Sequence, residues 1–294
     1  MAEHLLSVHD LHCGYGHKEI VHGVSLAMDE GEFACIIGAN GCGKTTLLKN
    51  ILCLEKPFAG DIRMQGRTVV SMTDQERARI FAYLPQAHTP PFPFTVGDVV
   101  LMGRSPYLDR FSRINKHDRE IAWEAMRLLG IEDLARRTYT KLSGGQRQLI
   151  LIARCLAQQP KLIIMDEPTA SLDFGNQQIV LSRMRELTKS GVSVLMVTHD
   201  PHHAFFCADR VFAMQEGRII ATGAPHDVMT RERLEDIYRT PLDVIDVDLR
   251  NGAETTVCVP LQATQCPKRK ESTCPTTPLN TTPSPRSCSR PSIP

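Results

Sequence analysis

The sequence lacks the features of a chain that crosses or enters a membrane by itself. No uninterrupted apolar stretch approaches the roughly 20 residues that a transmembrane helix needs. The first ten residues, MAEHLLSVHD, lack the basic and apolar blocks of a signal peptide. We therefore expect that any role at a membrane depends on a separate membrane subunit.

Net charge and regularly spaced cysteines are also missing. The formal net charge is only +1, so no overall field would attract nucleic acid or anionic lipid. The 10 cysteines include no CxxC pair, and several lie within apolar segments. We therefore expect buried free thiols rather than disulfides or a metal site.

What is present indicates one large domain followed by a tail. The 294 residues are 42% hydrophobic and 23% charged, which is ordinary for a globular protein with a substantial core. Beyond about Leu261 the chain consists of Pro, Thr, Ser, Lys and Arg with almost no large apolar residues. Such a segment cannot bury enough surface to offset its ordering entropy. We predict a domain over residues 4–260 and a disordered tail over residues 261–294.

The most informative stretch is GANGCGKTT, residues 38–46, which follows the apolar run FACII. Gly38, Gly43, Lys44 and Thr45 match G-x-x-x-x-G-K-[ST] in a strand–turn–helix context. The glycines allow successive N–H groups to point toward a phosphate, and the following helix adds its positive end. We predict that Lys44 binds the β and γ phosphates of a nucleotide and that Thr45 ligates Mg²⁺.

Cys42 lies inside this glycine-rich loop, unlike the other cysteines. We expect its alkylation to block nucleotide binding and bound ATP to protect it.

Two continuously apolar segments are followed by polar residues that suit phosphate chemistry. KLIIM, residues 161–165, precedes Asp166 and Glu167, and residues 192–197 precede His199. Continuous apolar runs indicate parallel strands covered on both faces, and an α/β sheet places its chemistry at their carboxyl ends. We predict that Asp166 holds the Mg²⁺ shell and that Glu167 polarises the attacking water. Exposed acids at a strand end are the alternative.

Three further positions remain open on the residues alone. LSGGQ, residues 142–146, begins a helix that Ser143 caps; two glycine N–H groups there could form a second anion site or serve only the cap. Tyr15, after Gly14, could stack on an adenine or be a surface tyrosine. Gln86, after a strand over residues 80–84, could sense the γ-phosphate and Mg²⁺ or be an ordinary polar residue.

Weaker patterns predict the remaining elements. Thr73 to Glu76 has the sequence of a capping box, and residues 115–129 show helical periodicity. Asn251-Gly252 is a hairpin signal. We expect strands over 5–12, 20–28, 60–64, 69–70, 210–214, 218–222, 243–249 and 254–259, and helices over 45–53, 96–103, 173–190 and 230–239, with an extended proline segment over 90–93.

The order GANGCGKT, Gln86, LSGGQ, LIIMDEP, Ser171-Leu172-Asp173 and His199 resembles the ATP-binding subunit of ABC transporters over about residues 5–240. The resemblance implies an α/β fold of the P-loop NTPase class. Its parts are a mostly parallel core sheet, an antiparallel β subdomain and a helical subdomain over about residues 88–158. It implies an active ATPase that uses ATP and Mg²⁺ in a head-to-tail dimer, where LSGGQ of one copy completes the site on the other.

The site residues that the resemblance and the motifs together imply fall into three groups. The catalytic group is Glu167, His199 and Gln86; the nucleotide-binding group is Tyr15, Gly38, Asn40, Gly41, Cys42, Gly43, Lys44, Thr45, Thr46, Ser143, Gly144, Gly145, Gln146 and Asp173; the Mg²⁺ group is Thr45, Gln86 and Asp166.

The segments FAYLPQ and PFPFTVGDVVLMGRSPY are similar to ATPases of importers for iron–siderophore, haem and cobalamin, with molybdate and tungstate relatives close by. Residues 95–107 fall where such subunits receive the permease. This resemblance implies a peripheral subunit at the cytoplasmic face of the membrane, working with integral permease subunits and indirectly with a solute-binding protein.

Soluble ABC ATPases of DNA repair are disfavoured because residues 86–143 are too few for a coiled-coil insertion. The ribosome type is disfavoured because only one cassette is present. A sensor that does not hydrolyse ATP is disfavoured by Glu167 and His199.

Overall fold

The structure is a computed structural model that describes residues 4–86, 93–108, 113–170, 172–250, 252 and 254–261. Most of the predicted proline segment, Ser171 and the predicted tail from residue 262 onward lie outside the described residues. Within the described ranges, no helix is both long and apolar enough to cross a membrane.

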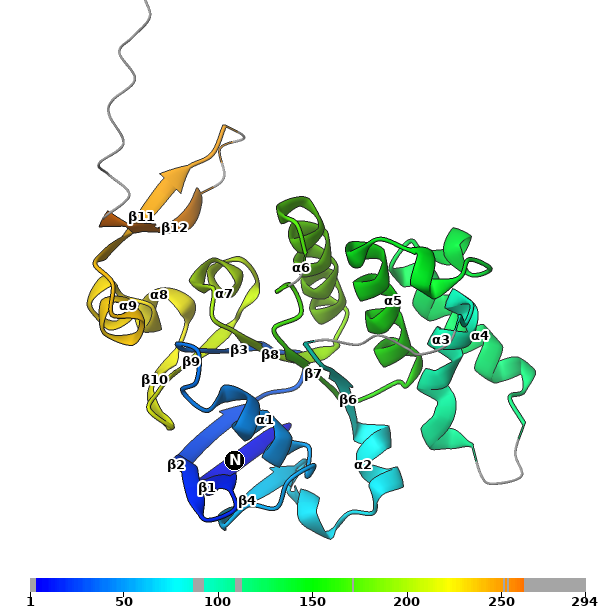
Figure 1. Cartoon of the computed structure of the whole chain (residues 1–294), viewed down its shortest axis with the longest axis horizontal. Coiled ribbons are helices and arrows are strands. Elements are labelled where there is room, and N and C mark those ends of the chain that lie inside the picture. Colours follow the sequence, from blue (N-terminus) through cyan, green and yellow to red (C-terminus); the bar gives the residue numbers. More distant parts are fainter. Residues whose placement is uncertain are drawn as a thin grey trace, which may run out of the picture.

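A six-stranded sheet lies at the centre of the molecule, in the order β10-β9-β3-β8-β7-β6 (Figure 1). Its neighbouring strands from β9 to β6 are parallel, and β10 joins β9 antiparallel. The strands are β3 (Phe33–Ile37), β6 (Phe81–Leu84), β7 (Leu162–Asp166), β8 (Ser193–Thr198), β9 (Arg210–Gln215) and β10 (Arg218–Gly223). The hairpin predicted over residues 210–222 therefore extends the sheet, as expected.

The continuously apolar strands are explained by two separate cores, one on each face of this sheet. Phe33, Cys35 and Ile37 of β3 belong to the core shared with the helices. Ala34 and Ile36 belong to the core shared with the second sheet. Because successive side chains of a strand point to opposite faces, a strand between two cores needs an apolar residue at every position.

The second sheet is antiparallel, in the order β2-β1-β4-β5. Its strands are β1 (Leu6–Tyr15), β2 (Lys18–Met28), β4 (Ala59–Met64) and β5 (Arg67–Thr68). β1 continues through Gly14 to Tyr15, beyond the predicted end at residue 12. Gly14 permits this, because a Cβ there would lie 1.9 Å from the Lys18 carbonyl oxygen of the paired strand.

The predicted bounds of one strand in this region are wrong, because the strand that pairs with β4 is β5 at residues 67–68 rather than 69–70. Residues 69–71 form a short 3₁₀ helix, η1 (Val69–Ser71), instead of the expected strand over 69–70. The turn buries Val69 completely, and the Ser71 hydroxyl donates a hydrogen bond to the Thr68 carbonyl at 2.7 Å. A local side-chain bond and one buried contact therefore replace the strand pairing.

The helices surround the core sheet, and α3, α4 and α5 pack together at one end of the molecule (Figure 1). The α-helices are α1 (Lys44–Ile51), α2 (Asp74–Ile80), α3 (Val96–Leu101), α4 (Lys116–Leu128), α5 (Gly144–Ala157), α6 (Phe174–Lys189), α7 (Pro201–Cys207), α8 (Pro225–Val228) and α9 (Arg231–Tyr238); the remaining 3₁₀ helices are η2 (Met102–Tyr107), η3 (Glu132–Leu134) and η4 (Tyr139–Lys141). The capping box at Thr73 is confirmed. Sequence reasoning missed α7 and α8, each of which has a proline in its first turn.

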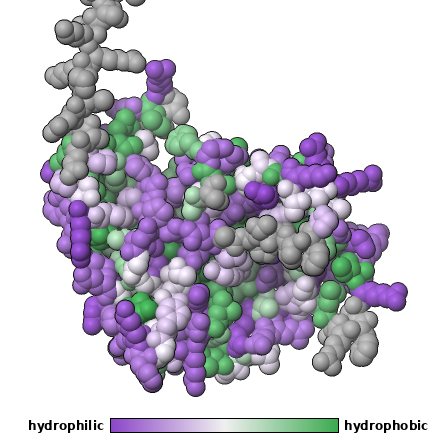
Figure 2. Space-filling model, in the orientation of Figure 1, coloured by the Kyte–Doolittle hydropathy of each residue, from purple (hydrophilic) through white to green (hydrophobic). Residues whose placement is uncertain are grey.

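The predicted C-terminal hairpin is confirmed as β11 (Leu242–Asp248) and β12 (Glu254–Pro260), which stand apart from the other sheets (Figure 1). It contacts α7 and α9. Its other face carries aliphatic side chains: Ile245 and Val247 are 44% and 37% exposed. The face of the molecule shown in Figure 2 is largely hydrophilic, with scattered apolar areas.

Candidate nucleotide-binding site

A pocket of about 450 Å³ lies where the first turn of α1 faces the end of β7. It is lined by Ile20, Asn40, Gly41, Gly43, Lys44, Thr45, Thr46, Gln86 and Glu167. Most of these residues come from the predicted phosphate loop. The pocket therefore brings together the glycine-rich loop, the strand-end glutamate and Gln86, which are far apart in the sequence.

The loop adopts backbone conformations that only glycine reaches easily. Gly41 and Gly43 have φ of 81° and 110°, and Gly43 caps the N-terminus of α1. A Cβ at Gly38 would lie 2.3 Å from the carbonyl oxygen of Met214 on β9. The predicted glycine pattern is thus required by backbone conformation at two positions and by close approach at the third.

Lys44 points back across the loop. Its ammonium donates hydrogen bonds to the carbonyl oxygens of Gly38 at 2.7 Å and Ala39 at 2.9 Å. The residue is only 5% exposed, so these carbonyls satisfy a charge that water would otherwise solvate. A phosphate oxygen would offer this ammonium a stronger, charged acceptor.

Thr45 and Asp166 meet at the bottom of the site, as their predicted shared role at Mg²⁺ requires. The Thr45 hydroxyl donates to Asp166 Oδ1 at 3.3 Å. Burial raises the pKa of Asp166, and the Thr45 hydroxyl only partly opposes this. A hydroxyl and a carboxylate are hard oxygen donors of the kind that Mg²⁺ prefers, so this pair fits that ion. No group of three or more His, Cys, Asp or Glu residues suited to a metal was found within the described part of the chain.

Glu167 lies between the two other predicted catalytic residues. Gln86 Nε2 donates to one of its carboxylate oxygens at 3.1 Å, and His199 Nδ1 lies 3.0 Å from the other. Glu167 has a positive φ of 48°, and its N–H bonds to the Val197 carbonyl of β8. The ends of β6, β7 and β8 therefore position Gln86, Glu167 and His199 as one cluster.

Tyr15 lies at the end of β1, beside Lys49 of α1, and is not among the residues that line the pocket. Lys49 Nζ is 5.5 Å from the centre of its ring and 3.4 Å from its hydroxyl. Ile20 of β2 lines the pocket instead. Sequence reasoning missed Ile20, because only the tertiary structure brings this strand residue to the phosphate loop, where a Cβ on Gly43 would lie 3.4 Å from it.

The LSGGQ segment does not line this pocket. Ser143 and Gln146 form a capping box: the Ser143 hydroxyl accepts from the Gln146 N–H, and the Gln146 side chain accepts from the Ser143 N–H. Gly145 packs so closely on α6 that a Cβ would lie 2.2 Å from Asn176 Oδ1. Asp173 caps α6 and binds the Asn176 side chain at 2.8 Å.

These contacts join the LSGGQ tip to the start of α6. Sequence reasoning missed the role of Asn176 in this contact. Ser143, Gly144, Gly145, Gln146 and Asp173 therefore form a second cluster in the chain, separate from the nucleotide pocket.

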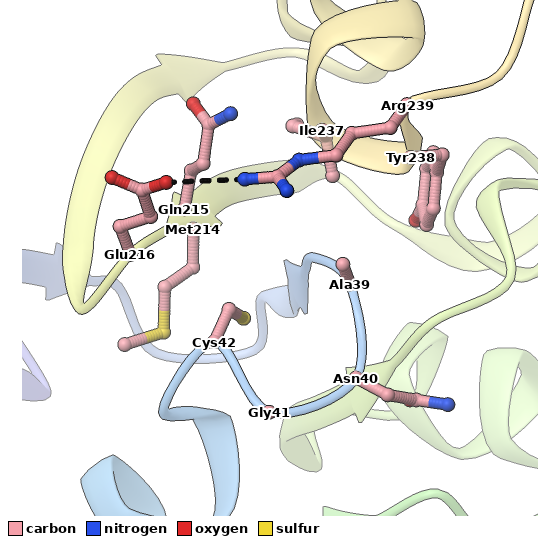
Figure 3. Close-up of a pocket in the computed structure, with 10 residues that line it drawn as sticks. All are labelled: Ala39, Asn40, Gly41, Cys42, Met214, Gln215, Glu216, Ile237, Tyr238 and Arg239. Carbon is pink, nitrogen blue, oxygen red and sulfur yellow. Dashed lines mark hydrogen bonds and ion pairs between the residues drawn. The ribbon is translucent and has the colours of Figure 1, made fainter.

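A different cavity of about 350 Å³ lies on the back of the phosphate loop (Figure 3). It is lined by residues 39–42 of the loop, 214–216 of β9 and its turn, and 237–239 at the end of α9. Figure 3 shows the Cys42 side chain pointing into the cavity, while the Asn40 side chain points away from the cavity. The Gly217 N–H also donates to the Cys42 carbonyl at 2.9 Å. The turn between β9 and β10 therefore contacts and supports the phosphate loop on the side of this cavity.

Comparison with known proteins identifies the family. The family profile described as ABC transporter matches residues 21–170. An uncharacterized ABC transporter ATP-binding protein of Haemophilus influenzae is 42% identical over 85% of this chain and 95% of its own length. The ferric enterobactin transport ATP-binding protein of Escherichia coli is 37% identical over 85% of this chain and 92% of its own length. The iron(3+)-hydroxamate import ATP-binding protein of Bacillus subtilis is 35% identical over 82% of this chain and 90% of its own length.

Solved structures agree with the sequence relatives. A chain of an ABC transporter assigned to the metal-chelate type, in an inward-facing conformation, superposes with a TM-score of 0.79. It is 33% identical, over 89% of this chain and 99% of the other. An ATP-binding cassette of an ABC transporter in its ADP conformation gives a TM-score of 0.73 at 25% identity, over 81% and 99%. The chain belongs to the ATP-binding protein family of ABC transporters.

Proposed function

We propose that this chain is the ATP-hydrolysing subunit of an importer and that two copies together drive a membrane permease for a metal chelate, most specifically an iron–siderophore, haem or cobalamin. The observation that carries the ATPase assignment is the Glu167 cluster, in which the carboxylate is held between Gln86 and His199 at hydrogen-bonding distances. A subunit that only bound nucleotide would have no need of this arrangement.

In this proposal ATP occupies the pocket with its phosphates against the glycine N–H groups and Lys44. Thr45, Asp166 and Gln86 would hold Mg²⁺, which supplies charge neutralisation at the phosphates. Glu167 accepts the proton of a water that attacks the γ-phosphorus in line with the leaving oxygen. His199 orients Glu167 and the γ-phosphate, and ADP and inorganic phosphate are released.

The separation of LSGGQ from the nucleotide pocket supports a head-to-tail dimer. Ser143 and the glycine N–H groups after it form a positively polarised helix end with no acidic residue in its first turn. In the proposed dimer, this end and Asp173 of one copy close over the triphosphate bound by Lys44 of the other. Each chain then contributes two half-sites.

The permease would dock beside the helical subdomain. A groove of about 430 Å³ lies next to α2, and we name it the α1–α2 groove; its lining is Leu52, Cys53, Leu54, Asp74, Arg77, Ala78, Phe81 and Tyr83. Leu54 is 60% exposed there, so the groove offers apolar surface to a partner. This extends the expected docking region over residues 95–107, because Gln75 Nε2 and Arg79 Nε of α2 both donate to the Pro106 carbonyl.

The metal-chelate assignment rests on relatives. Relatives in Bacillus subtilis and Escherichia coli are named for import or transport of iron(3+)-hydroxamate and ferric enterobactin. A molybdate import ATP-binding protein of Haemophilus influenzae is 36% identical over 73% of this chain and 80% of its own length. Molybdate import is therefore the second candidate, and competition between iron–siderophore and molybdate uptake in reconstituted vesicles separates the two.

The decisive experiment on the ATPase assignment uses Glu167→Gln. We expect ATP to bind normally, hydrolysis to fall by about a hundredfold or more, and a stable dimer to form with Mg-ATP, because a general base contributes roughly that factor. Glu186→Gln is the matched control, since Glu186 pairs with Arg183 on the exposed face of α6. Hydrolysis at the normal rate by the Glu167 variant would exclude the proposed catalytic role.

The dimer arrangement is tested in the same trapped state. A photoreactive residue replaces Ser143 in one copy, and the partner copy is isotopically heavy. Mass spectrometry should find the crosslink on heavy residues 38–46. Crosslinks confined to the light chain, or to other segments, would contradict the shared site.

A further inference from the structure

One side chain connects the α1–α2 groove to the helix that carries LSGGQ. Gln158, the residue that caps the C-terminus of α5, donates through Nε2 to the carbonyl oxygens of Ala78 and Phe81. Both Ala78 and Phe81 line the groove. The groove wall is therefore hydrogen-bonded directly to the end of α5.

Two residues of η2 hold the same end of α5 from the other side. The Tyr107 hydroxyl donates to the Gln158 carbonyl at 3.0 Å. Arg104 Nη1 donates to the Ala157 carbonyl at 2.8 Å and to Gln159 Oε1 at 3.0 Å. The last carbonyl groups of α5 are thus bound by a cation and a hydroxyl, which suits the negative end of a helix.

Arg104 is a buried residue that joins η2 to both α4 and the end of α5. It is 4% exposed, its Nε donates to Asp118 Oδ1 of α4 at 3.0 Å, and its guanidinium stacks 4.0 Å from the centre of the Tyr107 ring. Gly103 lets η2 approach α5, because a Cβ there would lie 2.2 Å from the Arg154 carbonyl oxygen. A buried charge with this many partners has one allowed position, so η2 and α5 are held rigidly together.

We propose that Gln158, held by Arg104 and Tyr107, is the positioning residue that transmits movement of the α1–α2 groove wall to the LSGGQ tip. The proposal rests on the proposed function, in which the permease occupies the groove and LSGGQ closes on a second copy. α5 has 14 residues and at about 1.5 Å per residue spans about 21 Å. Displacement of one end of so short and continuous a helix moves the other end with it.

At its other end, α5 carries LSGGQ and contacts the start of α6. Ser143 begins α5, and Gly145 packs directly on Asn176 at the start of α6. A shift of α5 therefore changes the LSGGQ half-site that the chain offers to its twin. The side-chain bonds of Gln158 to the Ala78 and Phe81 carbonyls connect α5 to the groove without passing through the nucleotide pocket.

The test in the isolated chain combines Gln158→Met with Glu167→Gln. Met keeps the length of the side chain but cannot donate to Ala78 or Phe81. We expect the ATP concentration for half-maximal dimer formation, measured by light scattering, to rise about threefold to tenfold. Fluorescent ATP should bind the monomer with unchanged affinity, because Gln158 is not among the residues that line the nucleotide pocket.

Tyr107→Phe provides a second variant that keeps the ring stacked on Arg104 and removes only the hydroxyl. It should shift dimer formation in the same direction by a smaller factor. Thr188→Val is the matched control, since it removes a buried hydrogen bond of 3.0 Å to the Met184 carbonyl within α6. If Gln158→Met dimerised like its parent, or if Thr188→Val showed an equal shift, the inference would be overturned while the proposed function stood.

The second arm uses the complete transporter assembled with its permease. Wild-type ATP hydrolysis should respond to the loaded solute-binding protein. Gln158→Met should keep the unstimulated rate within about twofold and lose most of the response. A full response in this variant overturns the inference. A dimer that never forms in the Glu167→Gln parent overturns the proposed function itself, and this inference with it.

Discussion

At the scale of single residues, Glu167 illustrates how the fold creates a reactive position. Its φ of 48° is uncommon for a residue with a Cβ and costs conformational energy, on the order of 1–3 kcal/mol. The N–H bond to Val197 and the side-chain contacts with Gln86 and His199 hold it there. Asp166, one residue earlier, instead turns toward Thr45. The two adjacent carboxylates thus face different partners because the backbone turns between them.

Lys44→Ala should abolish most nucleotide binding. The variant removes one charged hydrogen-bond donor from the phosphates, which corresponds to about 1.5–3 kcal/mol, or roughly a tenfold to hundredfold rise in the Kd for ATP. Isothermal titration calorimetry measures this directly. Lys56→Ala, in the exposed segment after α1, is the control and should bind ATP normally. Equal affinities of the two variants would contradict the assignment of Lys44.

Cys42 should be a slow but consequential target of alkylation. Burial raises the pKa of its thiol, although Lys44 opposes the shift, so the thiolate needed for reaction is scarce at neutral pH. We expect the rate of N-ethylmaleimide addition to rise steeply with pH and ATP binding to be lost in proportion. The thiol faces the back cavity, so protection by ATP would act by stabilising the loop rather than by covering the sulfur.

Peptide mapping identifies which cysteine has reacted. Normal ATP affinity after complete modification of Cys42 would refute this expectation.

At the scale of elements, α7 connects the catalytic edge of the sheet to the C-terminal hairpin. Asp200 caps α7 and accepts from His202 Nδ1 at 2.9 Å. Cys258 of β12 donates its backbone N–H to His202 Nε2 at 3.1 Å. The hairpin is therefore anchored three residues after His199, and this anchor requires a neutral imidazole.

Acidic pH should loosen this anchor. The bond to Asp200 raises the pKa of His202 above its ordinary value of 6.5, although burial opposes the shift. The ion pair with Asp200 therefore stabilises the fold fully below about pH 6.5 and is lost as the pH rises through the raised pKa. A protonated Nε2 cannot accept from Cys258, so β12 loses its bond in the range where that ion pair is strongest.

Hydrogen exchange at the Cys258 amide, relative to its intrinsic rate, should therefore be faster at pH 5 than at pH 8. The Asp200 carboxylate also faces His203, and burial lowers the pKa of His203. His202→Gln keeps a polar side chain without titration and should remove the pH dependence. Identical pH profiles for this variant and the wild type would show that another group controls the hairpin.

At the scale of the whole molecule, two hydrophobic cores hold different elements against the central sheet. One core joins the central sheet to helices α3 to α9, and the other joins it to α1 and the antiparallel sheet. The nucleotide pocket lies at the carboxyl edge of strands that both cores hold. The α1–α2 groove and LSGGQ are connected through the helical side, so the nucleotide pocket and the proposed permease surface use different parts of one framework.

Removal of residues 262–294 should leave ATP hydrolysis within about twofold of the full chain. Every residue assigned to the nucleotide site and to the Gln158 path precedes residue 262, so the deletion removes none of them. A steady-state phosphate-release assay on both lengths tests this. A large loss would show that the tail contributes to the site.

Local sequence determined the phosphate loop, the buried parallel strands and the helix caps, because glycine spacing, continuous apolar runs and capping boxes act through neighbouring residues. The strand ends also allowed Asp166, Glu167 and His199 to be predicted as site residues before any contact was known. Sequence alone left Tyr15, Gln86 and Ser143 open, since their roles depend on segments far away in the chain. Only the tertiary structure brought Gln86 to Glu167, Asn176 to Gly145 and Gln158 to Ala78. Each of these contacts joins a polar side chain to a segment far away in the sequence, and no local periodicity encodes such contacts.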